Sequence, residues 1–178
     1  MVVLIAFHHR PSTKIITEVL HPEILEIKSG YAITPIAPPV PPIKHIKCER
    51  SKPCLALAEA IYYEGRGESI AGQIAIGWVV MNRKASDKFK ADTVSGVINT
   101  RCQFSYKCDG SMRNGIANKV AWGTSLMVAE GIKNGVFADP TNGADHYLNP
   151  KAVKTMPRWT QVYPKIASIG NHDFYVWK

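Results

Sequence analysis

The sequence has no long hydrophobic run. No apolar stretch approaches the roughly 18 residues that a membrane-spanning helix needs. The apolar stretch VVLIAF, residues 2–7, stands before the basic segment HHR. A conventional signal peptide has the opposite order, with basic residues first and a small-residue cleavage site after the apolar segment. We therefore predict neither a transmembrane helix nor a conventional signal peptide.

Recognisable nucleic-acid and metal motifs are also lacking. The formal net charge of +8 would attract polyanions. However, the basic residues are scattered, and no helix-turn-helix, zinc-finger or RNP-type pattern accompanies them, so an anionic cell envelope fits the charge equally well. The segment NHDFY, residues 171–175, lacks HExxH-like spacing, which favours a structural His172 over a metal ligand. We expect no cofactor, no metal and no nucleic-acid partner.

Cysteine is scarce, and its four residues fall into two pairs of equal spacing, Cys48 with Cys54 and Cys102 with Cys108. Zinc-binding pairs are usually separated by about two to four residues, fewer than separate the members of each pair here. Local disulfides fit the spacing better and would indicate an oxidising envelope compartment. Reduced, partly buried thiols are the alternative, and a zinc site is less favoured.

The residues that are present describe a globular protein with a short appendage. The chain has 178 residues, of which 46% are hydrophobic and 20% charged. The proline-rich stretch IAPPVPPIK predicts a stiff polyproline II linker within residues 36–50. Residues 1–35 are β-leaning and too few for an ordinary core, so we predict an extension that packs on the main domain or on a partner. Residues 51–178 form the predicted main domain.

Three helices are predicted in this domain. The first begins after Ser51 and ends at the glycines that follow Glu64. The second spans about residues 70–83, with an apolar face of Ile70, Ile74, Trp78 and Met81. The third spans roughly residues 117–133 and is marked by Val120, Thr124, Met127 and Val128. We expect residues 87–115 to form a loop that can include a hairpin, and the tail to end in a strand.

The stretch IYYEGRGES, residues 61–69, holds the main candidate for chemistry, Glu64. On a helix, Glu64 continues the apolar stripe of Leu57 and Ile61, so its carboxyl would face the core side. Burial there would raise its pKa and keep it protonated, as a general acid for glycosidic cleavage must be. The alternative is a polar residue at a frayed helix end, paired with Arg66 or Arg83. Periodicity by itself favours neither.

Other polar residues are weaker candidates. Glu68 would share a helix face with Glu64 only if the helix continued through the glycines, so a place at the start of the second helix is favoured over a role as second carboxylate. Gln73 is placed to reach back toward the end of the first helix, with solvent exposure as the alternative. For Arg83, a structural role at the helix end is favoured. Contacts to a bound sugar are predicted for Gln73, Gln103, Phe104, Ser105, Tyr147 and Asn149.

Taken together, these segments resemble the SleB-type cell wall hydrolases, the spore-cortex-lytic enzymes and their proteobacterial and phage relatives. LALAEAIYYEGRGESIAGQIAIGWVVMNR is similar to that family's A-x-x-E-A-R-G-E followed by G-Q-x-A-x-x-x-V-x-x-N-R. The segments CQFSYKCDG, DPTNGADHYLNP, PRW and IGNHDFY follow in the family's order. The resemblance implies an α+β, lysozyme-like fold, mainly helical with a small β-hairpin or sheet, and no cofactor.

The resemblance also implies an activity and assigns its essential acid to Glu64. Such enzymes act on peptidoglycan, at the β-1,4 bond between N-acetylmuramic acid and N-acetylglucosamine. A lytic transglycosylase needs one glutamate, which acts first as acid and then as base. If Glu68, Asp109 or Asp145 faced Glu64 across the cleft, hydrolysis with two carboxylates would be the alternative.

Two departures from the family pattern have structural consequences. Ser95 stands where proteobacterial members often carry a cysteine, and the resemblance then implies the pairs Cys48–Cys54 and Cys102–Cys108. Gly65 stands where the family commonly has alanine, a local loss of helix propensity of about 1 kcal/mol.

The expected role is that of a phage or bacterial lysin, an endolysin or a virion-associated enzyme. It would act in the periplasm or cell wall, with the host cytoplasm before lysis or the virion as its earlier location. The alternatives are a wall-binding module that keeps the fold without activity, and a virion structural protein that binds its partners through the N-terminal segment.

Overall fold

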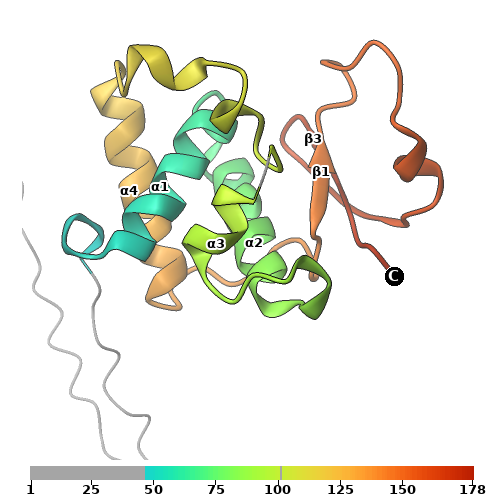
Figure 1. The fold of residues 1–178 in the computed structure, drawn as a ribbon, viewed down its shortest axis with the longest axis horizontal. Helices are drawn as coiled ribbons and strands as arrows, with labels where there is room; N and C mark the ends of the chain where they lie inside the picture. Colours follow the sequence, from blue (N-terminus) through green and yellow to red (C-terminus); the bar gives the residue numbers. More distant parts are fainter. Residues whose placement is uncertain (1–46, 101) are drawn as a thin grey trace, which may run out of the picture. The chain divides into compact units, whose positions relative to one another are not determined.

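The computed structural model describes residues 47–100 and 102–178. The predicted extension and residues 36–46 of the predicted linker lie outside this part. The elements, in chain order, are η1 (Cys48–Arg50), α1 (Lys52–Gly65), α2 (Ile70–Ala85), η2 (Asp87–Phe89), α3 (Val94–Asn99), η3 (Ser105–Lys107), η4 (Ser111–Asn114), α4 (Lys119–Lys133), β1 (His146–Leu148), η5 (Arg158–Gln161), β2 (Lys165–Ile169) and β3 (His172–Tyr175). In Figure 1 the helices α1 to α4 gather on one side, and the strands lie on the other together with the short helix η5. The expectation of a mainly helical α+β domain is confirmed.

The three predicted long helices are α1, α2 and α4. Two of them begin at capping side chains, because the Ser69 hydroxyl accepts from the Gly72 amide at 3.2 Å and the Asn118 side chain accepts from the Ala121 amide at 3.0 Å. Ser51 precedes α1, as predicted, but its side chain makes no capping hydrogen bond. Among the described residues, no helix combines the length and apolar character needed to cross a bilayer.

The predicted apolar faces of α2 and α4 are partly wrong. Ile70 is 42% exposed and Val120 is 82% exposed. The reason is that α2 is covered on more than one side, so its burial does not follow a single stripe. Val80 belongs to the core among the helices, whereas Ala75 and Val79 pack toward the sheet.

Residues 87–115 contain no hairpin in their described part, and the β-prone segment TVSGVI is instead helical. It forms α3, which begins where the Thr93 hydroxyl accepts from the Gly96 amide at 3.0 Å. Val94, Val97 and Ile98 are all buried against the other helices. The local cap and the i, i+3, i+4 spacing of these apolar residues outweigh their β-branched character.

The tail forms a three-stranded antiparallel sheet in the order β1–β3–β2. Tyr147 of β1 pairs with Phe174 of β3. Phe174 is fully buried with Ala75, Val79 and Ala144, so the sheet packs directly on α2. This packing brings β1 to the end of α1, where Glu64 lies.

Both predicted disulfides are present. Cys48 and Cys54 are bonded with their Cα atoms 4.8 Å apart, and Cys102 and Cys108 with theirs 5.7 Å apart. The first disulfide is fully buried at the start of α1. The second closes the segment that contains η3. It thereby restricts the conformations of the loop beside Glu64.

Candidate active site

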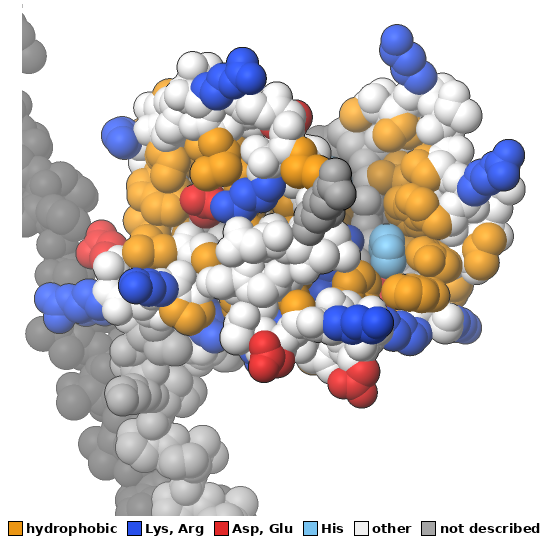
Figure 2. Space-filling view, viewed as in Figure 1, with side chains coloured by type: hydrophobic (Ala, Val, Ile, Leu, Met, Phe, Trp, Pro, Cys, Tyr) orange, Lys and Arg blue, Asp and Glu red, His pale blue; other side chains and the backbone are white. Residues whose placement is uncertain are grey.

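Glu64 lies in the last turn of α1, at the junction of the helical part and the sheet. Its Oε2 accepts a hydrogen bond from the Tyr147 hydroxyl at 3.0 Å. Its Oε1 is buried and has no hydrogen-bond partner within the described part of the chain. Figure 2 shows the surface hollowed between the helical part and the part that carries the sheet. One carboxyl oxygen is therefore held in place while the other is unpaired.

The environment of Glu64 favours its protonated form. Burial raises the pKa of the carboxyl above its ordinary value, and the negative charge of Asp109 acts in the same direction. The hydrogen bond from Tyr147, the positive charge of Arg83 and the nearby Ser105 backbone amide oppose this increase without cancelling it. Burial also raises the pKa of the Tyr147 hydroxyl well above its usual range, so this hydroxyl stays a donor. The geometry provides a carboxylic acid that can give up a proton and then hold the resulting charge.

Arg83 of α2 supplies the positive charge near this carboxyl. It is only 7% exposed, and the rings of Phe89 and Phe104 each lie 5.2 Å from its guanidinium carbon. Its Nε donates to the Asp145 carbonyl at 2.6 Å, and its Nη1 donates to Gln103 Oε1 at 3.4 Å. Burial lowers the pKa of the guanidinium, but an arginine side chain stays charged in proteins.

Arg83 was predicted to have a structural role at the end of the second helix, and its effect on Glu64 was missed. The useful signal was its place at the end of the family-like G-Q…N-R helix, next to Asn82. Asn82 was missed as well. Its side-chain amide donates to Asp139 Oδ2 at 2.9 Å and to the Ala144 carbonyl at 3.0 Å. It thus holds the turn that leads into β1 and Tyr147.

Glu68 lies between α1 and α2 and faces the turn between β2 and β3. Its Oε2 accepts from the Asn171 backbone amide at 3.1 Å, and its Oε1 accepts from the Asn171 side chain at 3.1 Å. His172 Nδ1 is 3.6 Å from the same Oε1. Burial by itself would raise the pKa of Glu68, but the hydrogen bonds from Asn171, helped by His172, lower it below the ordinary value. Glu68 is ionised and holds the hairpin of β2 and β3 through its hydrogen bonds to Asn171. It makes no described contact with Glu64.

Gln73 reaches back to the end of α1, as predicted. It is 4% exposed, and its Nε2 donates to the Glu68 carbonyl at 3.2 Å, while its Oε1 is buried without a described partner. Gly65 allows α2 to approach the end of α1 closely. A Cβ atom at Gly65 would lie 2.9 Å from Ile76 Cδ1 and 3.6 Å from Gln73 Cγ, so the lost helix propensity accompanies tight packing of α1 on α2.

The remaining predicted wall residues differ in their accessibility. Gln103 and Ser105 are exposed and Asn149 is half-buried, so all three can reach a ligand. Phe104 is buried in the core beneath Arg83. Two other carboxylates considered for a second role do not contact Glu64. Asp145 accepts from the Trp177 amide and from His146, and Asp109 is exposed, where it accepts from the Ser111 amide.

No group of histidine, cysteine and acidic side chains that could hold a metal ion occurs among residues 47–100 and 102–178. His172 instead lies against Tyr147, with ring centroids 5.3 Å apart, and beside Glu68. Burial lowers the pKa of His172, although the charge of Glu68 opposes this effect.

Comparison with known proteins gives a consistent family. The sequence profile of the family described as Cell Wall Hydrolase matches residues 67–175, a range that begins just after Glu64. The spore cortex-lytic enzyme of Bacillus cereus is 38% identical over 118 residues, which cover 66% of this chain and 42% of that protein. The enzyme of the same name from Bacillus subtilis is 36% identical over 118 residues, or 66% of this chain and 35% of that protein. The chain thus spans less than half the length of these relatives.

Solved structures agree with the sequence comparison. The catalytic domain of the germination-specific lytic transglycosylase SleB from Bacillus anthracis is 34% identical, with a TM-score of 0.54, and the match covers 70% of this chain and 95% of that one. The catalytic domain of the Bacillus cereus SleB protein is 35% identical, with a TM-score of 0.53, and 70% and 91% of the two chains are covered. The fold expected from the resemblance is confirmed. On the profile match, the sequence identities and the shared fold, this chain belongs to the cell wall hydrolase family.

Proposed function

We propose that this protein degrades peptidoglycan as a lytic transglycosylase, with Glu64 as its catalytic residue. The observation that carries the proposal is the state of the Glu64 carboxyl. Its Oε1 is buried, its pKa is raised, Tyr147 donates to its Oε2, and no second carboxylate contacts it within the described residues. The family relatives include an enzyme named as a lytic transglycosylase, which supports the same assignment.

The reaction needs only this one acid. Glu64 would donate its proton to the oxygen that links N-acetylmuramic acid to N-acetylglucosamine, and the bond from that oxygen to the muramyl C1 breaks. The carboxylate would then accept the proton of the muramyl 6-hydroxyl as its oxygen bonds to C1 and closes the 1,6-anhydro ring. The proton count balances, and no water is consumed. The Tyr147 hydroxyl and the charge of Arg83 would stabilise the carboxylate between the two steps.

Wall contacts are proposed for the residues that border Glu64. Gln103 and Ser105 come from the disulfide-closed loop, and Tyr147 and Asn149 come from β1 and the residues after it. Gln73 and Phe104 are proposed to act behind this surface, because both are buried. Glu68 is proposed to hold the hairpin in place.

Digestion of purified peptidoglycan with mass-spectrometric product analysis tests the proposal. The wild type is compared with Glu64→Gln and with Glu49→Gln, a matched control at an exposed position in η1. Anhydro products, lighter by one water than reducing muropeptides, are expected from the wild type and the control but not from Glu64→Gln. Reducing products would instead indicate a hydrolytic muramidase. Equal products from Glu64→Gln would remove Glu64 from the mechanism, and no products from any variant would favour a wall-binding role.

The setting of the reaction is a separate proposal. We infer action in the periplasm or cell wall, where the net charge of +8 would help the protein stay on an anionic envelope. A phage lysin, delivered as an endolysin or with a virion, remains the proposed biological role. Detection of the protein in purified virions, or of a specific complex with residues 1–45, would support the virion form. The absence of both would leave an endolysin or a bacterial enzyme.

A further inference from the structure

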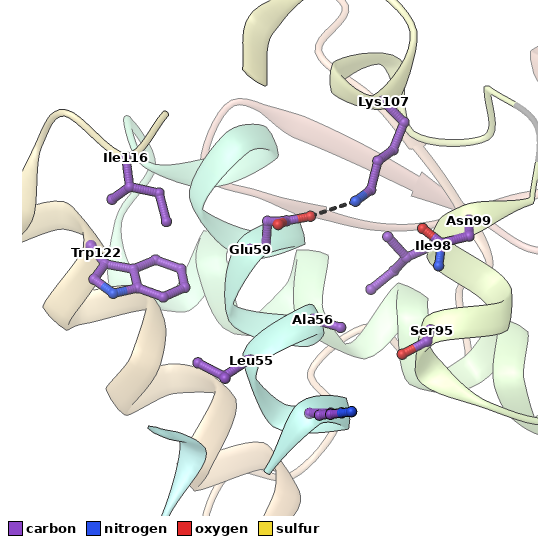
Figure 3. Close-up of a pocket in the computed structure, with 10 residues that line it drawn as sticks. Leu55, Ala56, Glu59, Ser95, Ile98, Asn99, Lys107, Ile116 and Trp122 are labelled. Carbon is purple, nitrogen blue, oxygen red and sulfur yellow. Dashed lines mark hydrogen bonds and ion pairs between the residues drawn. The ribbon is translucent and has the colours of Figure 1, made fainter. Parts of the chain in front are cut away.

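A cavity of about 380 Å³ opens between α1, α3, η3 and the start of α4, and its lining residues differ from those that contact Glu64. Leu55, Ile98, Ile116 and Trp122 form its apolar walls, and charged and polar side chains complete the lining. Figure 3 shows Glu59 and Lys107 pointing toward one another between these walls. A charged pair between apolar walls suits a ligand that carries both charged and apolar groups.

The hydrogen bonds at this pair leave capacity for a ligand. Lys107 Nζ lies 2.6 Å from Glu59 Oε1, and the Tyr106 hydroxyl donates to the same oxygen at 3.2 Å. No hydrogen bond from a described residue reaches Glu59 Oε2. The ammonium of Lys107 has three N–H donors, of which Glu59 takes one. The side chains are 24% and 28% exposed, so the cavity presents both an acceptor oxygen and unused donors.

The charge pattern specifies the kind of ligand. A purely apolar ligand would remove water from this ion pair without replacing it, which is costly. A ligand that carries an ammonium and a carboxylate on one carbon can pair the ammonium with Glu59 and the carboxylate with Lys107. The apolar walls then suit an alkyl chain behind that charged end. Lys52, also at the cavity, adds a second positive charge for the carboxylate.

The cavity is also close to the proposed catalytic residue. Glu59 and Glu64 lie five residues apart on the same helix, which is a rise of about 7.5 Å along its axis and a turn of about 140° around it. The short element η3 connects the cavity with the surroundings of Glu64. The amide of Ser105 lies near Glu64, and Lys107 borders the cavity. In peptidoglycan, the stem peptide begins on the muramyl sugar, and diaminopimelate is its third residue. Two extended residues span about 7 Å, and the side chain of diaminopimelate adds to this reach.

We propose that the cavity binds the free end of diaminopimelate, an amino-acid centre on an alkyl chain, in the stem peptide of the strand held at Glu64. The proposal rests on the proposed function and deepens it, because it names the wall chemotype that the site would select. A stem peptide with lysine as its third residue carries the side-chain ammonium but lacks the carboxylate on the same carbon. It would therefore lose the contact with Lys107.

Binding of isolated stem tripeptides tests the proposal without any glycan cleavage. The tripeptide alanyl-γ-glutamyl-diaminopimelate is compared with the same tripeptide ending in lysine, by calorimetry or NMR titration on the full chain. We expect the first to bind about tenfold more tightly, as a lost charged hydrogen bond implies. Lys107→Met should abolish this preference, whereas Lys154→Met, the same change at an exposed position in the sheet part, should preserve it.

A second variant protects the test against misfolding. Asn99→Trp at the exposed end of α3 would fill the cavity while leaving the ion pair intact, and it should weaken binding of both tripeptides. Equal binding of the two tripeptides to the wild type, or unchanged binding to a folded Asn99→Trp, would overturn the proposal. Peptidoglycan digestion is measured in parallel. Digestion without tripeptide preference refutes only the cavity assignment, and tripeptide preference without digestion refutes only the proposed catalysis.

Discussion

Replacing Tyr147 by phenylalanine removes one hydroxyl and tests how the protonation of Glu64 is controlled. The hydroxyl donates to Glu64 Oε2 at 3.0 Å and lowers the pKa of that carboxyl. A hydrogen bond contributes about 1.5–3 kcal/mol when the acceptor is charged and about 0.5–1.5 kcal/mol when both partners are neutral. The bond therefore favours the carboxylate over the acid by about 1–1.5 kcal/mol. Without it, the pKa of Glu64 should rise.

The expected result concerns the alkaline limb of the pH–activity profile. If Glu64 is the general acid, activity falls as pH rises through the pKa of its carboxyl. In Tyr147→Phe this fall should move to higher pH by about one unit, because about 1.4 kcal/mol corresponds to one pH unit. The assay is the initial rate of clearing of a peptidoglycan suspension across pH, at constant ionic strength.

The matched control is Tyr163→Phe. Tyr163 lies in the sheet part, and no hydrogen bond from its hydroxyl to a carboxylate occurs among the described residues, so its profile should equal that of the wild type. An alkaline limb that stays in place or moves to lower pH in a folded Tyr147→Phe would refute the reasoning. It would show that Glu64 is not the acid, or that Tyr147 does not bind its charged form.

Further predictions concern activity and stability. Glu64→Gln should lower activity by about 10²-fold or more. Because the folded-state pKa of Glu64 is raised, its stabilising contribution is present below the unfolded pKa and is lost as pH rises through the folded pKa. In thermal melts, Glu64→Gln should therefore be more stable than the wild type at neutral pH. At acid pH it should not be more stable. Glu68→Gln weakens the bonds from Asn171 and should cost about 1–2 kcal/mol in urea denaturation at pH 7. Since the folded pKa of Glu68 is lowered, that cost should shrink as pH falls through it, and an unchanged cost at low pH would contradict this role of Glu68. Replacing Cys102 and Cys108 by serine should cost about 2 kcal/mol in the same assay, from loop entropy. Equal stability with and without reductant would contradict this estimate.

Local sequence signals were enough for the elements that carry Glu64. Glycines after Glu64 end the first helix, Ser69 caps the next one, and the spacing of Leu57 and Ile61 places the carboxyl on the inner side of α1. These features depend on side chains within a few residues of one another, so they can be read without knowledge of the fold. The failure to predict α3 has a local cause as well. The helix α3 was missed because its β-branched residues favour a strand and the Thr93 cap was not recognised.

The sequence by itself thus determined the three long helices, the two short disulfide loops and the position of Glu64 at a helix end. Only the tertiary structure decided what surrounds that carboxyl. Tyr147 lies 83 residues away along the chain and reaches Glu64 because the sheet packs on α2 through Phe174. The charge of Arg83 affects the pKa of Glu64 because α2, which carries Arg83, packs against α1. Neither contact has a local signal, since burial and charge pairing between distant segments arise only when the segments pack together.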